Sequence, residues 1–238
     1  MKQFCMPLPK GIILGILLVC SLPALPQNSK PKNMVMADYQ KFHFGYSVGI
    51  NTAGFVILPN EGYQVKLVQG PGININLITD YRIGKFLDIR FLPGIQFTSR
   101  DITVTNKLTA DYKTWSIESV FVDLPMLLKY RSQRVNNYAP YLLVGFNPRM
   151  GILGHELPRG GFGKATRLIK IFDIYPELGV GCDFYLSMAK VAVELKFSVG
   201  MLDIFDGPAD PEFELYTNGI DKMFSRMVIL AFHVEQSR

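Results

Sequence analysis

The sequence predicts an all-β protein, an eight-stranded antiparallel up-and-down transmembrane β-barrel of the outer-membrane type. Three observations carry this prediction. Apolar and polar residues alternate with period two through most of the chain after residue 41. The segments that connect the alternating stretches are long and short in turn. No apolar run reaches the roughly 18 to 20 residues that a membrane-spanning helix needs, although 48% of the residues are hydrophobic and only 19% are charged.

The first 27 residues predict a secretory signal peptide. Lys2 and Lys10 form a positive region, residues 11–20 (GIILGILLVC) form an apolar core too short for a membrane-spanning helix, and SLPALPQ supplies a cleavage region of small residues. Cys20 leaves open a second interpretation, in which this cysteine accepts a lipid. Without the leader, Cys182 is the only cysteine, so no internal disulfide is expected and an apolar wall position is the simplest role for it.

The mature chain divides into a short lead-in and one barrel domain. Residues 28–41 are polar and contain a proline, which predicts a flexible segment, and the barrel is expected over residues 42–238. The formal charge of +5 falls to +3 once Lys2 and Lys10 are removed, because 23 basic and 20 acidic residues remain. A charge this small does not favour nucleic acid as a partner.

The alternation predicts eight strands of about 10 to 16 residues. In the first, FHFGYSVGIN, residues 42, 44, 46, 48 and 50 are apolar and the residues between them are small or polar. Seven further stretches follow the same rule, at about 72–82, 87–102, 115–131, 142–149, 172–184, 191–200 and 227–235. No stretch has a convincing helical period.

The lengths of the connections support an up-and-down order. Long loops are expected at about 52–69, 103–114, 151–168 and 203–222, and short turns around 84, around 136–137 and at 187–190. Long and short connections therefore fall at opposite ends of the barrel, and both chain termini fall at the end with the short turns. Outer-membrane barrels have this layout.

Alternation alone leaves open whether the charged face is the lumen of a membrane barrel or the outer surface of a soluble, lipocalin-like barrel. Strands of ten or more residues match a tilted membrane crossing, whereas soluble strands usually have five or six. Glycines gather on the polar face, where a narrow interior needs small residues. Aromatic residues near the strand ends resemble interfacial girdles. These features favour the membrane barrel.

The polar face supplies a set of charged residues for the lumen. An eight-stranded barrel is just filled by its own side chains, so we expect a mutually neutralising network rather than a diffusion channel, with proton or ion passage as the alternative. The expected members are Arg82, Arg90, Arg100, Asp123, Lys129, Arg131, Arg149, Asp173, Glu177, Asp183, Glu194 and Lys196.

Two histidines lie on strands that the closure of the barrel makes neighbours. His43 belongs to the first strand and His233 to the last, both on the polar face, so a histidine pair in the lumen is possible. No third histidine or cysteine accompanies them, and no nucleophile elbow or zinc-ligand spacing occurs elsewhere. We therefore expect no enzyme activity, no cofactor and no small-molecule substrate.

Prolines recur inside four successive strands, at Pro93, Pro125, Pro148 and Pro176. Each removes a hydrogen-bond donor from a sheet that has no free edge, so each is expected to mark a bulge or local break. The four positions suggest a weakened patch of wall suited to contact with another membrane protein or to distortion of the lipid. Tolerated bulges without a role are the simpler alternative.

Several segments resemble, in order, the PorT family of Bacteroidetes outer-membrane proteins. They are FHFGYSVGIN, PGININLITDYRIGKFLDIRFLPGIQFTSRD, ESVFVDLPMLLKYRS, NNYAPYLLVGFN, DIYPELGVGCDFYL, ELKFSVGM and SRMVILAFHVE. The resemblance covers about residues 42–235. It implies an accessory component of the type IX (Por) secretion system, which exports cargo carrying a dedicated C-terminal signal and, in gliding relatives, motility adhesins. It carries over no catalytic residues.

Two classes of function therefore stand beside each other. The leading expectation is a non-enzymatic barrel in the outer membrane that assists type IX secretion, with outer-membrane lipid and other secretion components as partners. The alternative is a structural or adhesive surface barrel that binds through its long loops. An outer-membrane enzyme that uses His43 and His233 is the third class.

Overall fold

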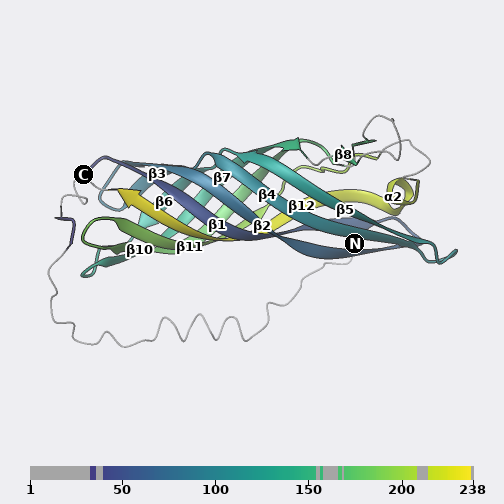
Figure 1. Ribbon diagram of the computed structural model, residues 1–238, viewed down its shortest axis with the longest axis horizontal. Helices are drawn as coiled ribbons and strands as arrows, with labels where there is room; N and C mark the ends of the chain where they lie inside the picture. The colour runs from purple at the N-terminus through teal and green to yellow at the C-terminus, as the bar shows by residue number, and fades with distance from the viewer. Residues whose placement is uncertain are drawn as a thin grey trace, which may run out of the picture. The chain divides into compact units, whose positions relative to one another are not determined.

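Figure 1 shows the computed structural model of the chain. The structure describes residues 33–35, 40–153, 156–157, 166–167, 169–207 and 214–236. All of them belong to one unit, Lys32–Arg238. The predicted signal peptide over 1–27, with Cys20, lies outside the described residues.

Eight wall positions form a closed antiparallel ring. Six are single strands, and the third and fourth are each made of two successive strands. In chain order the wall consists of β1 (Phe42–Pro59), β2 (Tyr63–Arg82), β3 (Leu87–Phe91) with β4 (Gly94–Asn106), β5 (Tyr112–Asp123) with β6 (Met126–Arg131), β7 (Tyr138–Leu153), β10 (Phe172–Tyr185), β11 (Lys190–Val199) and β12 (Ile220–Gln236). The ring closes because β1 pairs with β2 on one side and β12 on the other. The predicted eight-stranded up-and-down barrel is confirmed.

The two ends of the barrel differ. The short connections 83–86, 132–137 and 186–189 lie at one end, together with the start of β1 and the end of β12. At the other end lie the β1–β2 and β4–β5 turns, the small hairpin of β8 (Glu156–Leu157) and β9 (Thr166–Arg167), and helix α2 (Glu214–Gly219) (Figure 1). In outer-membrane barrels the short turns face the periplasm and the longer connections face outside.

Among the described residues, no helix has both the length and the apolar character needed to cross a bilayer.

Two of the predicted long loops are strand instead. β1 continues to Pro59 and β2 begins at Tyr63, so a tight turn replaces the loop expected over 52–69. Gly62 in this turn has a φ of 86°, a conformation that glycine adopts without steric cost. β4 and β5 likewise reduce the loop expected over 103–114 to residues 107–111, and β12 begins at Ile220 rather than near 227.

A β-bulge in β2 is one reason why the alternation of apolar and polar residues did not predict these strand extensions. The pairing of β2 with β4 shifts between Gln69 and Gly72, so one residue is added to β2 at Gly70–Pro71. Ile73 points out of the barrel below this bulge, whereas Val65 packs against an interior cluster above it. Because both residues have odd numbers, the sequence pattern alone gives no sign that the inward face has changed.

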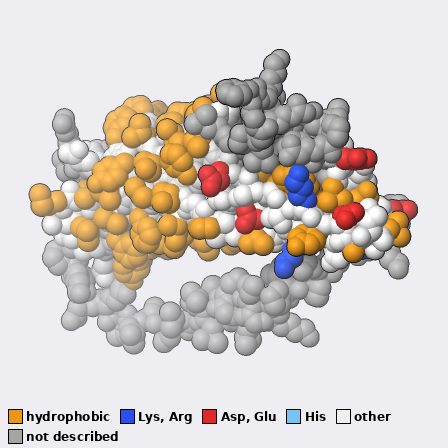
Figure 2. All heavy atoms as spheres, turned by 45° about the vertical axis from the view of Figure 1, so that its right-hand side comes forward, with side chains coloured by type: hydrophobic (Ala, Val, Ile, Leu, Met, Phe, Trp, Pro, Cys, Tyr) orange, Lys and Arg blue, Asp and Glu red, His pale blue; other side chains and the backbone are white. Residues whose placement is uncertain are grey.

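The wall therefore has two regions, which we name here. The outer extension comprises residues 53–59, 63–70, 101–106, 112–118 and 220–225, and the membrane half is the rest of the wall. On the membrane half the exposed side chains of every strand are apolar, among them Ile50, Ile75, Phe97, Val144 and Phe232; the exceptions, Thr52, Arg226 and Gln236, lie at its two edges. Figure 2 shows this apolar surface at one end of the molecule. At the other end a few acidic and basic side chains lie among uncharged ones.

The interiors of the two regions are opposite in character. The outer extension encloses an apolar cluster that includes Phe55, Ile102, Trp115, Ile117 and Met223, all at most 4% exposed. The membrane half encloses polar and charged side chains. Cys182 is partly buried on the membrane half, in agreement with a wall position.

Candidate functional site

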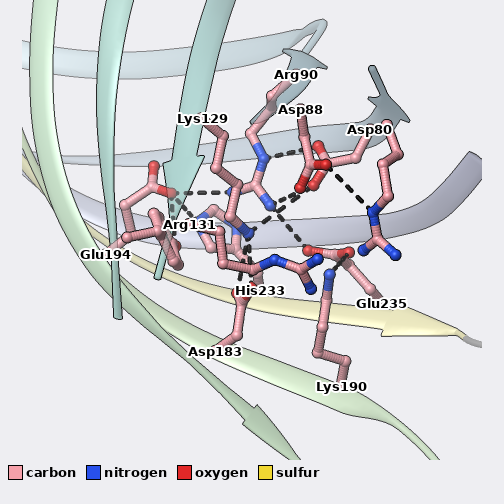
Figure 3. A network of polar contacts seen from close by, with 12 residues as sticks. Asp80, Asp88, Arg90, Lys129, Arg131, Asp183, Lys190, Glu194, His233 and Glu235 are labelled. Carbon is pink, nitrogen blue, oxygen red and sulfur yellow. Dashed lines mark hydrogen bonds and ion pairs between the residues drawn. The ribbon is translucent and has the colours of Figure 1, made fainter. Parts of the chain in front are cut away.

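The lumen of the membrane half centres on Arg90 of β3, whose side chain is 0% exposed. Its guanidinium contacts three carboxylates from different strands (Figure 3). Nη2 lies 2.6 Å from Asp80 Oδ2 and 2.9 Å from Glu235 Oε1, and Nη1 lies 3.0 Å from Glu194 Oε2. Nε donates a further hydrogen bond of 2.7 Å to Asp80 Oδ1. One arginine thus joins β2, β11 and β12 across the barrel.

Further contacts extend this cluster toward the periplasmic end. Lys129 lies 2.8 Å from Asp183 Oδ2, and Lys190 pairs with Glu235. Arg82, the last residue of β2, has its Nε 3.3 Å from Oδ1 of Asp88 on β3. These pairs link neighbouring and facing strands, so each charge of this cluster has an opposite charge beside it.

Three side chains from other strands meet one oxygen atom of Glu194. Besides Arg90, the Tyr141 hydroxyl donates to Oε2 at 2.8 Å, and His233 Nε2 lies 3.1 Å from the same atom. Lys196 Nζ lies 3.8 Å from the other oxygen, Oε1. Glu194 is therefore the junction through which the first cluster reaches a second one nearer the outer end.

The second cluster lies beneath the outer extension. The Arg149 guanidinium donates to both carboxylate oxygens of Asp123, at 2.6 and 3.2 Å. Lys196 Nζ lies 3.5 Å from Glu177 Oε2. Asn147 Nδ2 donates to Glu177 Oε1 at 2.9 Å. The bidentate arginine contact fixes the geometry as well as the charge balance.

Three of the predicted lumen residues have other partners. Arg100 donates to Ser225 Oγ at 3.1 Å and stacks its guanidinium 4.3 Å from the centre of the Phe55 ring, where the polar lumen meets the apolar cluster. Arg131 donates to the Tyr185 hydroxyl at 2.6 Å. Asp173 accepts backbone N–H groups of Ile174 and Leu202, at 2.7 and 3.0 Å.

The charges of the interior balance. Among the described residues, eight buried side chains are acidic and eight are arginine or lysine. The twelve residues predicted for the lumen all face inward, and the structure adds Asp80, Asp88, Lys190 and Glu235 to them. The alternation already placed the three acids on the polar face, whereas Lys190 fell in a predicted turn.

The two predicted lumen histidines are both buried but are not brought together. In the pairing of β1 with β12, His233 lies opposite Ser47, four residues from His43. This offset corresponds to about 13 Å of strand. No group of three potential metal ligands occurs in the part of the chain that the structure describes.

The four prolines form an oblique line across adjacent wall strands. The expected local break occurs at Pro93, between β3 and β4, and at Pro125, between β5 and β6. It does not occur at Pro148 or Pro176, where β7 and β10 pair without a register shift. The line is continuous because Leu92 N–H donates to Pro125 O at 3.1 Å and Leu124 N–H donates to Pro148 O at 3.1 Å. Pro176 lies opposite Phe146, two residues from Pro148.

Further residues pack at each end of the lumen. The apolar cluster of the outer extension lies over the outer end. At the periplasmic end, Asn33 donates through its backbone to Asn137 Oδ1 at 2.8 Å and through its side chain to Tyr185 O at 3.1 Å. Met34 packs on Ala139 and Tyr185. The lead-in expected to be flexible over 28–41 is thus anchored to the barrel at these two residues.

Comparison with known proteins gives a family and a set of similar folds. Ail of Yersinia pestis, solved with the heparin analogue sucrose octasulfate, is 10% identical over 82% of this chain and 99% of its own, with a TM-score of 0.39. Neisserial surface protein A is 12% identical over 80% and 96%, with a TM-score of 0.43. OprG of Pseudomonas aeruginosa is 11% identical over 83% and 95%, with a TM-score of 0.43. No curated protein matches the sequence.

The family assignment rests on the sequence itself. The family model described as outer membrane protein beta-barrel domain matches residues 27–206, about three quarters of the chain. The matched region contains the wall from β1 to β11, whose lipid-facing side chains and polar lumen are described above. The chain therefore belongs to the outer membrane protein beta-barrel domain family and resides in the outer membrane.

Proposed function

We propose that this barrel is a non-enzymatic accessory component of type IX protein secretion, which acts through its surfaces. One observation supports a role for the surfaces of the barrel rather than for its interior. The lumen of the membrane half is filled by a balanced ion-pair network, and an apolar cluster lies over its outer end. The resemblance of residues 42–235 to the PorT family supplies the secretion system.

The network argues against transport through the lumen. Arg90, Lys129, Asp183 and Glu194 have fully buried side chains, and each contacts at least one opposite charge. A solute passing through the barrel would have to separate these pairs in a water-poor interior, and uncompensated buried charges are costly. The purified barrel should therefore give no steady conductance in a planar lipid bilayer, and porin-like open-channel steps would contradict this part of the proposal.

Secretion in the native bacterium tests the main proposal. Deleting the gene should abolish release and surface processing of cargo with the C-terminal secretion signal, and the intact gene on a plasmid should restore both. The amount of folded barrel in the outer membrane is followed through its heat-modifiable mobility on gels. Normal secretion without the gene would reject the proposal.

A double variant, His43→Ala with His233→Ala, separates a surface role from catalysis. Neither histidine belongs to a group of three potential metal ligands among the described residues. We expect the double variant to support secretion like the intact protein, provided that it reaches the outer membrane in equal amounts. Loss of secretion by a folded, correctly inserted double variant would favour a chemical role.

The outer extension favours a second candidate, a surface barrel that binds through its exposed end. Lys66, Ser116, Glu118 and Lys222 are exposed on strands that continue beyond the lipid-facing band. Antibody fragments against the β4–β5 turn, residues 107–111, should block binding to cells or matrix if this candidate is correct, and should leave secretion of cargo unchanged.

A further inference from the structure

The outer wall of the barrel carries two successive rows of side chains at the boundary between the membrane half and the outer extension. The lower row is apolar and crosses five strands, because Leu230 pairs with Ile50, Ile50 with Ile73, Ile73 with Phe97, and Phe97 with Val120. The row above it consists of Val228, Thr52, Pro71, Ser99 and Glu118. Most members of this upper row have small side chains, so they leave space over the wall.

The two rows line a groove of about 670 Å³ on the outer surface. The bulge at Gly70–Pro71 lies beside the groove, and β2 and β4 come very close there. A Cβ atom added to Gly70 would meet the carbonyl of Ser99 at 1.9 Å, and one added to Gly72 would meet the carbonyl of Phe97 at 2.2 Å. The volume falls within the range of pockets that hold small organic ligands.

A second hollow of about 290 Å³ shares Thr52 and Val228 with the groove and continues it toward β11. Arg226 lines this second hollow, directly above Val228 on β12. Its neighbour on β1 is Gly54, which has no side chain to cover it. Arg226 is exposed and has no ion-pair partner among the described residues.

The groove and the arginine stand at the level where lipid headgroups are expected. The lower row of the groove is apolar, with Ile50, Ile73 and Phe97 each about half exposed. Above the groove, exposed polar residues such as Ser116 and Lys66 appear beside the apolar Val56 and Val68. This change of outward character marks the outer boundary of the bilayer. An apolar groove that opens toward the lipid and ends beside a cation is complementary to an acyl chain that carries a phosphate.

We propose that this groove is a binding site for one phosphate-bearing acyl lipid of the outer leaflet, with a chain lying over Thr52, Pro71 and Ser99 and the phosphate on Arg226. The proposal needs only the location of the barrel in the outer membrane and is independent of its role in secretion. A protein partner fits the surface less well, because the groove is continuous with the lipid-facing band. Among the described residues that line the two hollows, Arg226 is the only cation, and Glu118, the only acid, lies on β5 at the opposite end of the upper row.

The test compares two lipids that differ only in the phosphate. The full-length mature barrel is purified in detergent and titrated with dipalmitoyl phosphatidic acid or dipalmitoylglycerol, and bound lipid is counted by native mass spectrometry. We expect one saturable phosphatidic acid per barrel and about tenfold weaker retention of dipalmitoylglycerol, since a charge-assisted contact contributes roughly this factor.

Two groove variants locate the site, and one removes the cation. Ser99→Trp on β4 and Thr52→Phe on β1, two strands away, fill the groove, and each should weaken retention of both lipids at least tenfold. Arg226→Gln should abolish the preference for phosphatidic acid while leaving retention of dipalmitoylglycerol unchanged. Having two filling variants guards against misfolding of one, and heat-modifiable mobility shows which of them is folded.

Matched controls keep the test falsifiable. Val144→Trp enlarges a lipid-facing side chain on β7, outside the groove, and Lys107→Gln removes an exposed cation at the β4–β5 turn. Both should bind like the intact barrel. Equal retention of the two lipids by the intact barrel, binding without saturation, or unchanged binding by folded Ser99→Trp and Thr52→Phe would overturn the proposal. It would also be overturned if a protein, and no lipid, were released from the native barrel by those variants.

Discussion

The membrane half and the outer extension share the same strands but are built inside out with respect to each other. Along β4, successive inward residues are Gln96, Thr98 and Arg100 in the membrane half and then Ile102 and Val104 in the extension, all at most 5% exposed. The pleat of the strand continues without interruption through this change. The reversal therefore lies in the side chains and not in the backbone.

On β5 the outer face of the wall changes in the opposite sense. On β5, Val120 and Val122 face the lipid, whereas Ser116 and Glu118 are exposed above them. The closed hydrogen-bond ladder suits both surroundings, because it satisfies the backbone N–H and C=O groups both in lipid and in water. Lipid outside the wall requires apolar residues on the outer face, and there the interior contains paired charges. Where water surrounds the wall, polar residues can face outward and the interior is an apolar core.

The largest effect is expected from breaking the charged interior. Arg90→Leu leaves Asp80, Glu194 and Glu235 without their shared cation in a buried site. The free energy of unfolding should fall by about 3 to 5 kcal/mol, the usual cost of leaving a buried charge unpaired. Urea unfolding of barrels in lipid vesicles, followed by tryptophan fluorescence and gel mobility, measures this loss.

Lys66→Leu provides the control for that experiment, because Lys66 is exposed on β2 in the outer extension. Its removal should change the free energy of unfolding by less than about 0.5 kcal/mol, as is usual for surface substitutions. Equal losses in the two variants would show that the network in the lumen contributes no more than a solvated charge.

A somewhat smaller effect is expected from the apolar interior of the extension. Ile102→Ala removes a fully buried side chain that packs in the cluster with Phe55 and Trp115, and about 2 to 4 kcal/mol should be lost. Because the cluster lies outside the membrane half, the loss should appear as faster amide exchange in residues 101–106 and 112–118. Unchanged exchange there would mean that the cluster does not hold the extension together.

The sequence predicted the parts of this comparison that depend on period two alone. The ring of eight strands, the lipid-facing residues and the inward direction of all twelve lumen residues follow from parity within each strand. Pair partners do not follow, because Arg90 meets Glu194 and Glu235 only through the register and closure of the barrel. Sequence separations of 104 and 145 residues leave no local signal for these contacts.

The outer extension escaped prediction for a different physical reason. The bulge at Gly70–Pro71 exchanges the inward and outward faces of β2. At the same level of the wall the interior changes from polar to apolar, so the two changes cancel in the sequence pattern of β2. In β1, residues 53–59 (AGFVILP) are apolar on both faces, since Val56 and Leu58 are exposed while Phe55 is buried. A strand without alternation, bounded by glycine and proline, is read from sequence as a loop.

The outer surfaces of the two regions should differ in their tolerance of charge. Val144→Arg places a cation on the lipid-facing side of β7, within the apolar band, and should cost about 2 to 4 kcal/mol of unfolding free energy. Ser116→Arg places the same side chain on the exposed face of β5 in the extension and should change this free energy by less than about 0.5 kcal/mol. Unfolding in vesicles measures both, and a cost at Ser116 equal to that at Val144 would place the extension inside the bilayer.

The smallest expected effect concerns the line of prolines, which compares one side of the membrane half with the other. Pro93, Pro125, Pro148 and Pro176 each lack a backbone donor, whereas β1 and β12 pair without a shift from Phe44 to Leu58. A missing hydrogen bond of about 1 kcal/mol should speed exchange of the amides beside the prolines about five- to tenfold relative to amides at equal depth in β1 and β12. Pro148→Ala restores a donor and should slow exchange next to it. Uniform protection around the ring would show that the prolines are tolerated without weakening the wall, and would remove the basis for treating this side of the barrel as a contact surface for other membrane proteins.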